Sequence, residues 1–360
     1  MTVPGRRLSR NCRTEPWVPF WRSGHMDGES LLFLETTPGE PATSSLLVTP
    51  GGPVSLKSAT GEVEYVENVD YTLDRASGVL TRTSESRISK MTIAELHPSL
   101  DPDGSGFMHV RGNPTAFLMV GDGDLFHRRQ ATASYSFDKS QWIGYTPDFA
   151  GANVPRTLER LRRREALTLC LIGDSISEGY NASGFIGAPP YQPPYGALVA
   201  AGLERVYRSR VTLRNFATAG WTSDDGLSAV GAVAAEQPHL VLIAFGMNDA
   251  GYADPADYAA NIGAIVEGIR RPAPRTEFVL LSSMLPNPEW HYPQMERFAG
   301  YRRALSDLCG PGIILADVTT LWTDVMVRKT PYDLTGNGIN HPNDFGHRLY
   351  SQTILSLLAE

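Results

Sequence analysis

The sequence predicts an α/β protein in which a doubly wound, five-stranded parallel sheet follows an antiparallel β-sandwich. Two observations predict this fold class. Short alternating segments without helical periodicity fill residues 1–150, and apolar runs alternate with helix-length segments over residues 166–360. A linker and a short helix, residues 151–165, separate the two patterns. The 360 residues, 42% apolar and 20% charged, have the composition of an ordinary globular protein.

The first part is predicted to be built from strands with one buried face. The clearest strand candidates are Ser30–Glu35, Gly61–Val66, Phe107–Arg111 and Thr132–Phe137. Turn formers at Asp101–Gly104 and Gly112–Pro114 separate them. Because the apolar face of each strand needs a second layer to cover it, a sandwich is the expected packing.

The stretch Tyr145–Pro155 is rich in turn formers and predicts the linker, and a short helix is expected through Arg164. Buried parallel strands are then expected at Leu167–Ile172, Val211–Phe216, Leu240–Phe245, Phe278–Leu281 and Ile313–Ala316. The helix-length segments between them are Tyr195–Tyr207, Asp224–Glu236, Pro255–Ile269 and Gln294–Cys309. In such a sheet ligands bind beyond the carboxyl ends of the strands.

The charge pattern argues against two classes of partner. A formal net charge of −7 is unlike that of proteins that bind nucleic acid or an anionic membrane, because these need clustered Lys and Arg. The one basic cluster, Arg160–Arg164, is interpreted as a solvated helix face. No segment reaches the roughly 20 apolar residues of a membrane span. We therefore expect neither a nucleic-acid nor a membrane partner.

The cysteines and the N-terminus bear on cofactor and location. Cys12, Cys170 and Cys309 are an odd set without ligand-like spacing, so neither a disulfide framework nor a metal site is expected, and no cofactor is predicted. Cys170 lies inside an apolar run and is expected in the core. The first residues include arginines but no apolar run of signal-peptide length. A cytoplasmic protein is expected, with secretion left open if the start is incomplete.

The apolar run from Leu169 ends at Gly173-Asp174-Ser175, which places a hydroxyl at the end of a strand. This position indicates a candidate catalytic nucleophile. A serine is a weak nucleophile at neutral pH and needs a base and donors for the oxyanion. Three later segments offer such groups, each just after a strand or in the final loop. They are Asn215–Gly220, Phe245–Asp249 and Asn340–Asp344.

Four blocks in this order resemble the SGNH hydrolases, the GDSL-type esterase and lipase superfamily. They are Gly173-Asp174-Ser175, Gly220, Gly246-Met247-Asn248-Asp249 and His341 within His341–Gly346. The resemblance covers about residues 166–360 and implies a flavodoxin-like sheet. It also implies that Ser175 is the nucleophile and His341 the base.

The same resemblance assigns the oxyanion donors to the backbone N–H of Ser175, the backbone N–H of Gly220 and the side-chain amide of Asn248. Each residue type suits its role. Glycine lets the backbone approach a substrate without a Cβ in the way, and asparagine donates a hydrogen bond without carrying charge.

One position departs from the family pattern. The family carries an aspartate three residues before the histidine, but here that position is Gly338. Either a backbone carbonyl orients the imidazole, giving a Ser-His dyad, or another carboxylate such as Asp333 reaches it. The dyad is favoured because Asp333 lies outside the motif, and Asp333→Ala is then expected to keep most of the activity.

Neighbouring polar residues have structural interpretations. Asp174 could act as a catalytic acid, but an aspartate here is expected to order the turn through local hydrogen bonds. Asp249 and Asp344 are interpreted as loop and helix-capping residues, with Asp344 opening the last helix. His347 falls within that helix and is interpreted as structural.

Two long loops bear on the substrate. Asn181–Tyr195 and Leu285–Tyr292 are rich in proline and aromatic residues, which suit sugar rings but also aryl or acyl groups, and ordinary loop packing explains them equally well. A β-sandwich before an SGNH domain resembles acetyl esterases that act on plant polysaccharides.

The leading hypothesis is therefore hydrolysis of short acyl esters, acetyl first, from a carbohydrate, and the expected partner is a small-molecule or oligosaccharide acyl ester. The alternatives are a general short-chain carboxylesterase or thioesterase, and an acyltransferase in which a sugar hydroxyl replaces water. A non-catalytic carbohydrate-binding protein on a degenerate hydrolase fold is a further alternative, against which the intact Ser175, Gly220, Asn248 and His341 argue.

Overall fold

The computed structural model describes residues 18–359, and Cys12 lies outside this range. Its C-terminal half is built on five parallel strands in the order β13-β12-β14-β15-β16. Their bounds are Leu167–Gly173 for β12, Val211–Asn215 for β13, Leu240–Ala244 for β14, Glu277–Leu281 for β15 and Ile313–Ala316 for β16. This is the flavodoxin-like order, so the doubly wound sheet expected from the sequence is confirmed.

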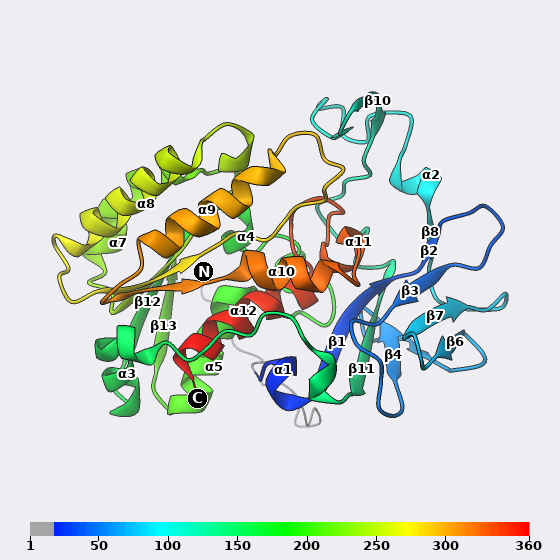
Figure 1. Cartoon of the computed structure of the whole chain (residues 1–360), viewed down its shortest axis with the longest axis horizontal. Coiled ribbons are helices and arrows are strands. Elements are labelled where there is room, and N and C mark those ends of the chain that lie inside the picture. Colours follow the sequence, from blue (N-terminus) through cyan, green and yellow to red (C-terminus); the bar gives the residue numbers. More distant parts are fainter. Residues whose placement is uncertain (1–17, 360) are drawn as a thin grey trace.

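Helices cover both faces of this sheet. Figure 1 shows α7, α8 and α9 on one face and α5 and α12 on the other. The longer helices are α5 (Tyr195–Tyr207), α8 (Pro255–Arg270), α9 (Met295–Asp307), α10 (Val318–Met326) and α12 (Asp344–Leu358). The shorter ones are α3 (Pro155–Arg162), α4 (Ser175–Glu178), α6 (Ser223–Gly226), α7 (Val230–Ala235) and α11 (Pro331–Leu334). Every residue of β14 and β15 is buried, as expected for parallel strands covered on both faces.

One expected helix is broken. The segment expected to be helical over 224–236 forms α6, a 3-10 turn at Leu227–Ala229 and then α7. Thr222 and Asp225 make reciprocal capping bonds that start α6. Gly226 lies so close to β14 that a Cβ there would be 2.6 Å from the Phe245 ring. Tight packing against Phe245 therefore accompanies the break in the helix.

The N-terminal half contains two larger sheets besides a two-stranded hairpin, which confirms the expected antiparallel β domain. One has the order β1-β11-β4-β5 and the other β6-β7-β3-β2-β8, in which only the β2–β8 pair is parallel. The first sheet comprises β1 (His25–Leu32), β11 (Gln130–Ser136), β4 (Ser55–Ser58) and β5 (Glu64–Tyr65). The second comprises β6 (Tyr71–Asp74), β7 (Val79–Arg82), β3 (Thr43–Ser45), β2 (Leu34–Glu35) and β8 (Met91–Thr92).

Outside these sheets lie α1 (Phe20–Ser23), α2 (Ile93–Leu96) and a hairpin of β9 (His109–Val110) and β10 (Asn113–Phe117). Two expected strands are shorter than the sequence suggested. Within 61–66 only Glu64–Tyr65 pairs, because Gly61 takes a φ of +74° in the turn after β4. Within 107–111 only His109–Val110 pairs.

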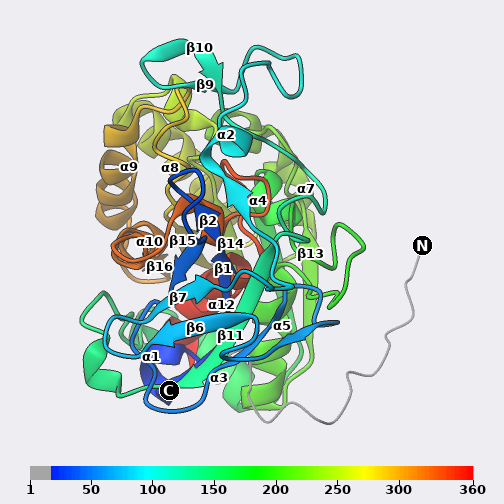
Figure 2. The same cartoon turned by 90° about the vertical axis from the view of Figure 1, so that its right-hand side faces the viewer.

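The two halves share one core. A single hydrophobic cluster includes Leu31 of β1, Leu171 of β12 and Leu349 of α12. Figure 2 shows the β-rich half lying against the parallel sheet and its helices. A buried ion pair also crosses between the halves, with Lys329 Nζ 2.8 Å from Glu29 Oε1 and both side chains fully buried. The domain boundaries proposed from the sequence stay a prediction, and the halves are physically joined.

Candidate active site

The hydroxyl of Ser175 lies at the carboxyl edge of the parallel sheet. β12 ends at Gly173, Asp174 caps the next helix by accepting a hydrogen bond from Ile176 N at 2.9 Å, and Ser175 is the first residue of α4. A Cβ at Gly173 would lie 2.5 Å from the carbonyl oxygen of Ala244, so only glycine permits this tight turn beside β14. The Ser175 side chain is therefore held at a helix start, and the residue is 6% exposed.

The imidazole of His341 faces this hydroxyl. Ser175 Oγ lies 2.9 Å from His341 Nε2, although the two residues are 166 positions apart. His341 is held by a turn in which Asn337 Oδ1 accepts hydrogen bonds from the backbone N–H groups of Ile339, Asn340 and His341, each at 3.0 Å. The structure thus brings together the nucleophile and the base expected from the sequence.

A carboxylate contacts the other ring nitrogen of His341, and it was not predicted from the sequence. Asp122 Oδ1 lies 2.8 Å from His341 Nδ1, on the side of the ring opposite Ser175. A carboxylate only accepts hydrogen bonds, so Nδ1 carries the proton and Nε2 is free to accept one from Ser175. The Asp122 side chain is 52% exposed, and its partial desolvation would by itself raise its pKa, but the hydrogen bond and charge of His341 and the Asn337 amide lower the pKa below its usual value.

The expected Ser-His dyad is therefore wrong as a description of the geometry. Asp333 is not the missing carboxylate either. Asp333 is buried in the capping box of α11, where it accepts from Thr330 N at 2.8 Å and from Leu32 N at 2.7 Å. Its role is to join α11 to β1, so Asp333→Ala tests the fold rather than the chemistry.

The three expected oxyanion donors lie on neighbouring loops at the same edge. Gly220 is exposed with a φ of +81°, and a Cβ there would meet nothing within 4 Å, so its backbone faces open space. Among the described residues, nothing accepts a hydrogen bond from its N–H. Asn248 Nδ2 donates to the carbonyl of Trp221 at 2.8 Å, which leaves its second amide hydrogen for a ligand. That bond ties Asn248 to the segment that carries Gly220.

Nearby acidic residues serve the loops. Burial raises the pKa of Asp174 to about 7, and this carboxyl is committed to the α4 cap. Burial also raises the pKa of Asp249, which accepts from Ser223 N at 3.0 Å and from Gly246 N at 3.1 Å. The expected structural roles of these two residues agree with their contacts.

The start of the last helix differs from the sequence prediction in one detail. Asn343, not Asp344, caps α12, and Asp344 accepts from Ser183 N at 2.7 Å, which holds the loop after the nucleophile. His347 is fully buried in α12, where its Nε2 faces the carbonyl of Tyr180 at 3.1 Å, as a structural histidine would. Burial lowers its pKa to about 4.

The two aromatic loops have different roles. Trp290, in the second loop, is 2% exposed and packs edge-on against Phe107 at 5.3 Å, so it serves loop packing. In the first loop, Tyr191 is 62% exposed and Phe185 44% exposed. The ring of Tyr180, just before that loop, lies 5.0 Å from the ring of His341. The Phe185 ring of the first loop lies 4.9 Å from the ring of Tyr180, so this loop places one aromatic ring next to the residue that contacts His341.

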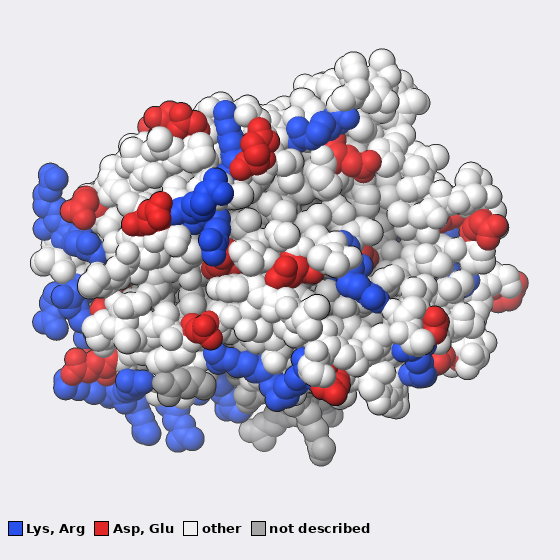
Figure 3. Space-filling model, in the orientation of Figure 1, with Lys and Arg blue, Asp and Glu red and all other residues white. Residues whose placement is uncertain are grey.

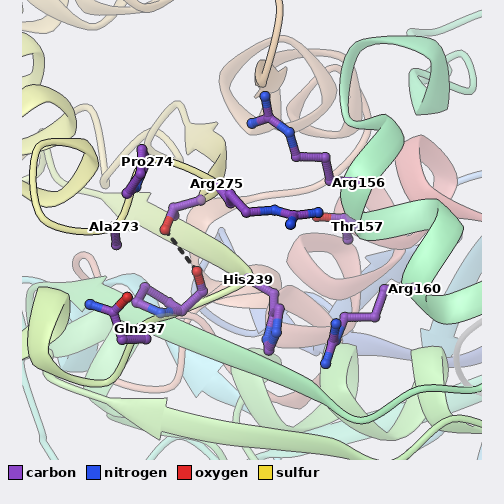
Figure 4. Close-up of a pocket in the computed structure, with 10 residues that line it drawn as sticks. Arg156, Thr157, Arg160, Gln237, His239, Ala273, Pro274 and Arg275 are labelled. Carbon is purple, nitrogen blue, oxygen red and sulfur yellow. Dashed lines mark hydrogen bonds between the residues drawn. The ribbon is translucent and has the colours of Figure 1, made fainter.

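Other surfaces lie away from this site. A hollow of about 390 Å³ opens near the start of β14 and β15, at the amino edge of the sheet, and Figure 4 shows arginines and His239 around it. Figure 3 shows basic side chains near α3 with acidic ones among them, and Arg163 pairs with Glu159 at 2.5 Å.

Within residues 18–359 no group of three or more His, Cys, Asp or Glu side chains could hold a metal ion. In the same range, no helix is long and apolar enough to span a bilayer.

Comparison with known proteins settles the family. The family model described as GDSL-like Lipase/Acylhydrolase matches residues 171–349. This segment belongs to that family. The match starts inside β12 and contains the Ser175, Gly220, Asn248 and His341 blocks, so the resemblance seen in the sequence is confirmed, and Asp122 lies outside the matched segment. The family match thus covers the segment that carries all four sequence blocks.

Among solved structures, one similar fold is a two-domain esterase active on acetylated mannans, co-crystallised with mannopentaose. It has 20% identity and a TM-score of 0.46, over 59% of this chain and 54% of that chain. Another is an acetylxylan esterase from Geobacillus stearothermophilus, with 19% identity and a TM-score of 0.42, over 52% of this chain and 92% of that one. The present chain thus matches about half the length of the two-domain esterase. A comparison with curated proteins found no match.

Proposed function

We propose that this GDSL-family protein is a serine esterase that removes short acyl groups, acetyl first, from a carbohydrate. The observation that carries the proposal is the 2.9 Å contact between Ser175 Oγ and His341 Nε2, at the sheet edge whose neighbouring loops carry Gly220 and Asn248. A nucleophile, a base and oxyanion donors at one sheet edge are the components of acyl transfer through a covalent intermediate.

In the first half-reaction Ser175 Oγ forms a bond to the acyl carbon while His341 Nε2 takes the hydroxyl proton. The carbonyl π electrons move to the oxygen, which the Ser175 N–H, the Gly220 N–H and the Asn248 amide stabilise. When the tetrahedral intermediate collapses, the bond to the alcohol breaks and His341 gives its proton to the leaving alcohol. Water then repeats the sequence on the acyl-enzyme, which releases the carboxylic acid and restores Ser175.

Two features support a short acyl group on a sugar. Ser175 and His341 are 6% and 7% exposed, so a small acyl group reaches the hydroxyl more easily than a bulky one. The exposed rings of Phe185 and Tyr191 offer flat apolar surface of the kind that sugar faces stack on.

The test is acetate release from acetylated oligosaccharides, together with aryl esters of increasing acyl length. We expect activity to fall as the acyl chain lengthens, and Ser175→Ala to lower kcat by more than about 10⁴-fold. Ser228→Ala is the matched control, because this exposed serine lies in the 3-10 turn after α6. Equal activity in Ser175→Ala would refute the mechanism. Faster turnover of long-chain or thioester substrates, or transfer of acetyl to an added sugar, would support the alternative activities instead.

A further inference from the structure

A loop of the N-terminal half lies where the family's aspartate would be. Gly338, three residues before His341, has a φ of +82°. A Cβ at this position would lie 2.5 Å from Phe126 Cζ and 2.8 Å from the carbonyl oxygen of Met119. Any side chain at 338 would therefore collide with residues 119–126, which we call the acid loop because it carries Asp122.

Contacts with the C-terminal half hold the acid loop in place. Phe126 is fully buried and stacks on Tyr332 of α11, with 6.3 Å between the ring centroids and 8° between the planes. Asn181 Nδ2, just after the nucleophile turn, donates to the carbonyl of Gly123 at 3.2 Å. Gly121 N donates to the carbonyl of Asn337 at 3.3 Å, inside the turn that leads to His341. The acid loop is thus attached to the same segments that position Ser175 and His341.

The side chain of Asn337 orients the carboxylate. Its Oδ1 accepts from backbone N–H groups of the His341 turn, so its Nδ2 must face the opposite way. There Nδ2 lies 3.3 Å from Asp122 Oδ1 and 3.1 Å from His341 Nδ1. Asn337 therefore donates a hydrogen bond to the same carboxylate that accepts one from His341 Nδ1–H. Asn337, Asp122 and His341 thus form one hydrogen-bond network.

We propose that the N-terminal half supplies the acidic member of the triad through Asp122, in place of the aspartate that Gly338 excludes, so that Ser175 is activated only when the acid loop is docked. This inference rests on the proposed esterase function and deepens it. Asp122 touches neither substrate nor reacting atoms in this scheme, so it is a positioning residue that acts through His341.

The network predicts what happens when the carboxylate is lost. With Asp122 present, the Nδ1 proton has an acceptor and Nε2 stays unprotonated, ready for the Ser175 proton. Without it, the nearest group to Nδ1 is the Asn337 amide nitrogen, which can only donate. Nδ1 then becomes the acceptor, the ring proton moves to Nε2, and His341 cannot serve as the base.

The experiment compares Asp122→Ala with Asp124→Ala in the full chain. Alanine is used because the amide oxygen of an asparagine could still accept from His341 Nδ1 and Asn337 Nδ2. Asp124 is the matched control because it lies two residues away in the same loop and pairs with exposed Arg128. We expect Asp122→Ala to lower kcat on an aryl acetate by about 10⁴-fold with little change in KM, as for a wrong histidine tautomer. Asp124→Ala is expected to stay within about threefold of the wild type, because its contacts are at the surface.

A charge-exchanging second variant separates positioning from folding. In Asp122→Ala/Asn337→Asp a carboxylate oxygen takes the place of the amide nitrogen 3.1 Å from His341 Nδ1, and the other oxygen still accepts from the turn. We expect this variant to recover at least about 100-fold of the lost kcat, because the correct tautomer regains an acceptor. Circular dichroism and Tm confirm that each variant folds.

A readout that needs no substrate keeps this inference distinct from the proposed function. Nitrogen-15 NMR of the histidines reports which ring nitrogen of His341 carries the proton at neutral pH. We expect Nδ1–H in the wild type and Nε2–H in Asp122→Ala, whether or not an ester is turned over. A folded Asp122→Ala variant that keeps Nδ1–H, or keeps more than a tenth of the wild-type kcat, would overturn the role of Asp122. A wild type with the expected tautomer but no activity on any ester would instead refute the esterase proposal.

Discussion

Replacing Asn248 with alanine removes one of the three proposed oxyanion donors and leaves the triad geometry in place. Asn248 Nδ2 uses one amide hydrogen on the carbonyl of Trp221 at 2.8 Å, and the other is available to the oxyanion. Trp221 follows Gly220, so the same bond holds two donors at a fixed spacing. The variant therefore removes a donor and also loosens the loop that carries the second one.

The size of the effect follows from these contacts. A single oxyanion donor stabilises the transition state by about 3–4 kcal/mol, and each 1.36 kcal/mol corresponds to about tenfold in rate, so kcat should fall by about 10²–10³-fold. The ground-state carbonyl gains much less from this donor, so KM should change little. Trp221 is partly exposed, so water can replace the lost donor to its carbonyl, and the free energy of unfolding should fall by about 1 kcal/mol or less.

The assay is kcat and KM on an aryl acetate, combined with the affinity for an arylboronic acid, whose tetrahedral adduct with Ser175 mimics the intermediate. Asn261→Ala is the matched control, because this asparagine on α8 donates to Ser223 Oγ at 3.1 Å and serves the fold. Affinity for the boronic acid should fall in proportion to kcat/KM. A folded Asn248→Ala variant with less than a tenfold loss in kcat, or with the loss entirely in KM, would refute the donor role.

Two further predictions concern stability. Lys329→Met leaves the buried carboxylate of Glu29 without its cation, so the free energy of unfolding, measured by chemical denaturation, should fall by about 3–5 kcal/mol. The control is Lys57→Met at an exposed position, and an equal loss in the two variants would contradict the prediction. Burial lowers the pKa of His347 to about 4 from an unfolded value near 6.5, so the unfolded chain binds a proton first and stability falls as pH drops through that window. The control is His347→Gln, which can still donate to the carbonyl of Tyr180. Relative to it, the free energy of unfolding of the wild type should fall by about 3 kcal/mol between about pH 6.5 and 4. Parallel curves of unfolding free energy against pH for the two proteins would refute this.

The parallel sheet was predictable because its strands are locally unambiguous. The central strands are apolar runs of strand length that end at a turn or helix start, whereas edge strand β13 contains Arg214 and Asn215. The expected runs at Leu240–Phe245 and Ile313–Ala316 fall within one residue of β14 and β16. Buried parallel strands need apolar residues on both faces, so their signal does not depend on distant partners. The N-terminal strands are short and paired across turns, so their ends depend on long-range contacts that no local pattern records.

Ser175 and His341, the proposed nucleophile and base, could be located from the sequence because each lies in a motif tied to a strand end or the final loop. The third member was not. Asp122 lies 219 residues before His341, in a turn-forming run, Gly121-Asp122-Gly123-Asp124, that resembles an ordinary exposed loop. Nothing in that run specifies a partner. Its only sequence-level signal is indirect, because a histidine that acts as a base without a neighbouring carboxylate leaves its Nδ1 proton without an assigned acceptor.

Gly338 links these observations physically. An aspartate at 338 would strike Phe126 and the Met119 carbonyl, so the acid loop could not dock as it does. A glycine at 338 without the acid loop would leave His341 with no carboxylate, and the Asn337 amide would then favour the wrong tautomer. Gly338 and the acid loop therefore depend on each other. Together they replace a carboxylate at position 338 by the carboxylate of Asp122. In this chain the glycine at the expected acid position therefore marks the place where another segment packs, and that segment carries the carboxylate that contacts His341.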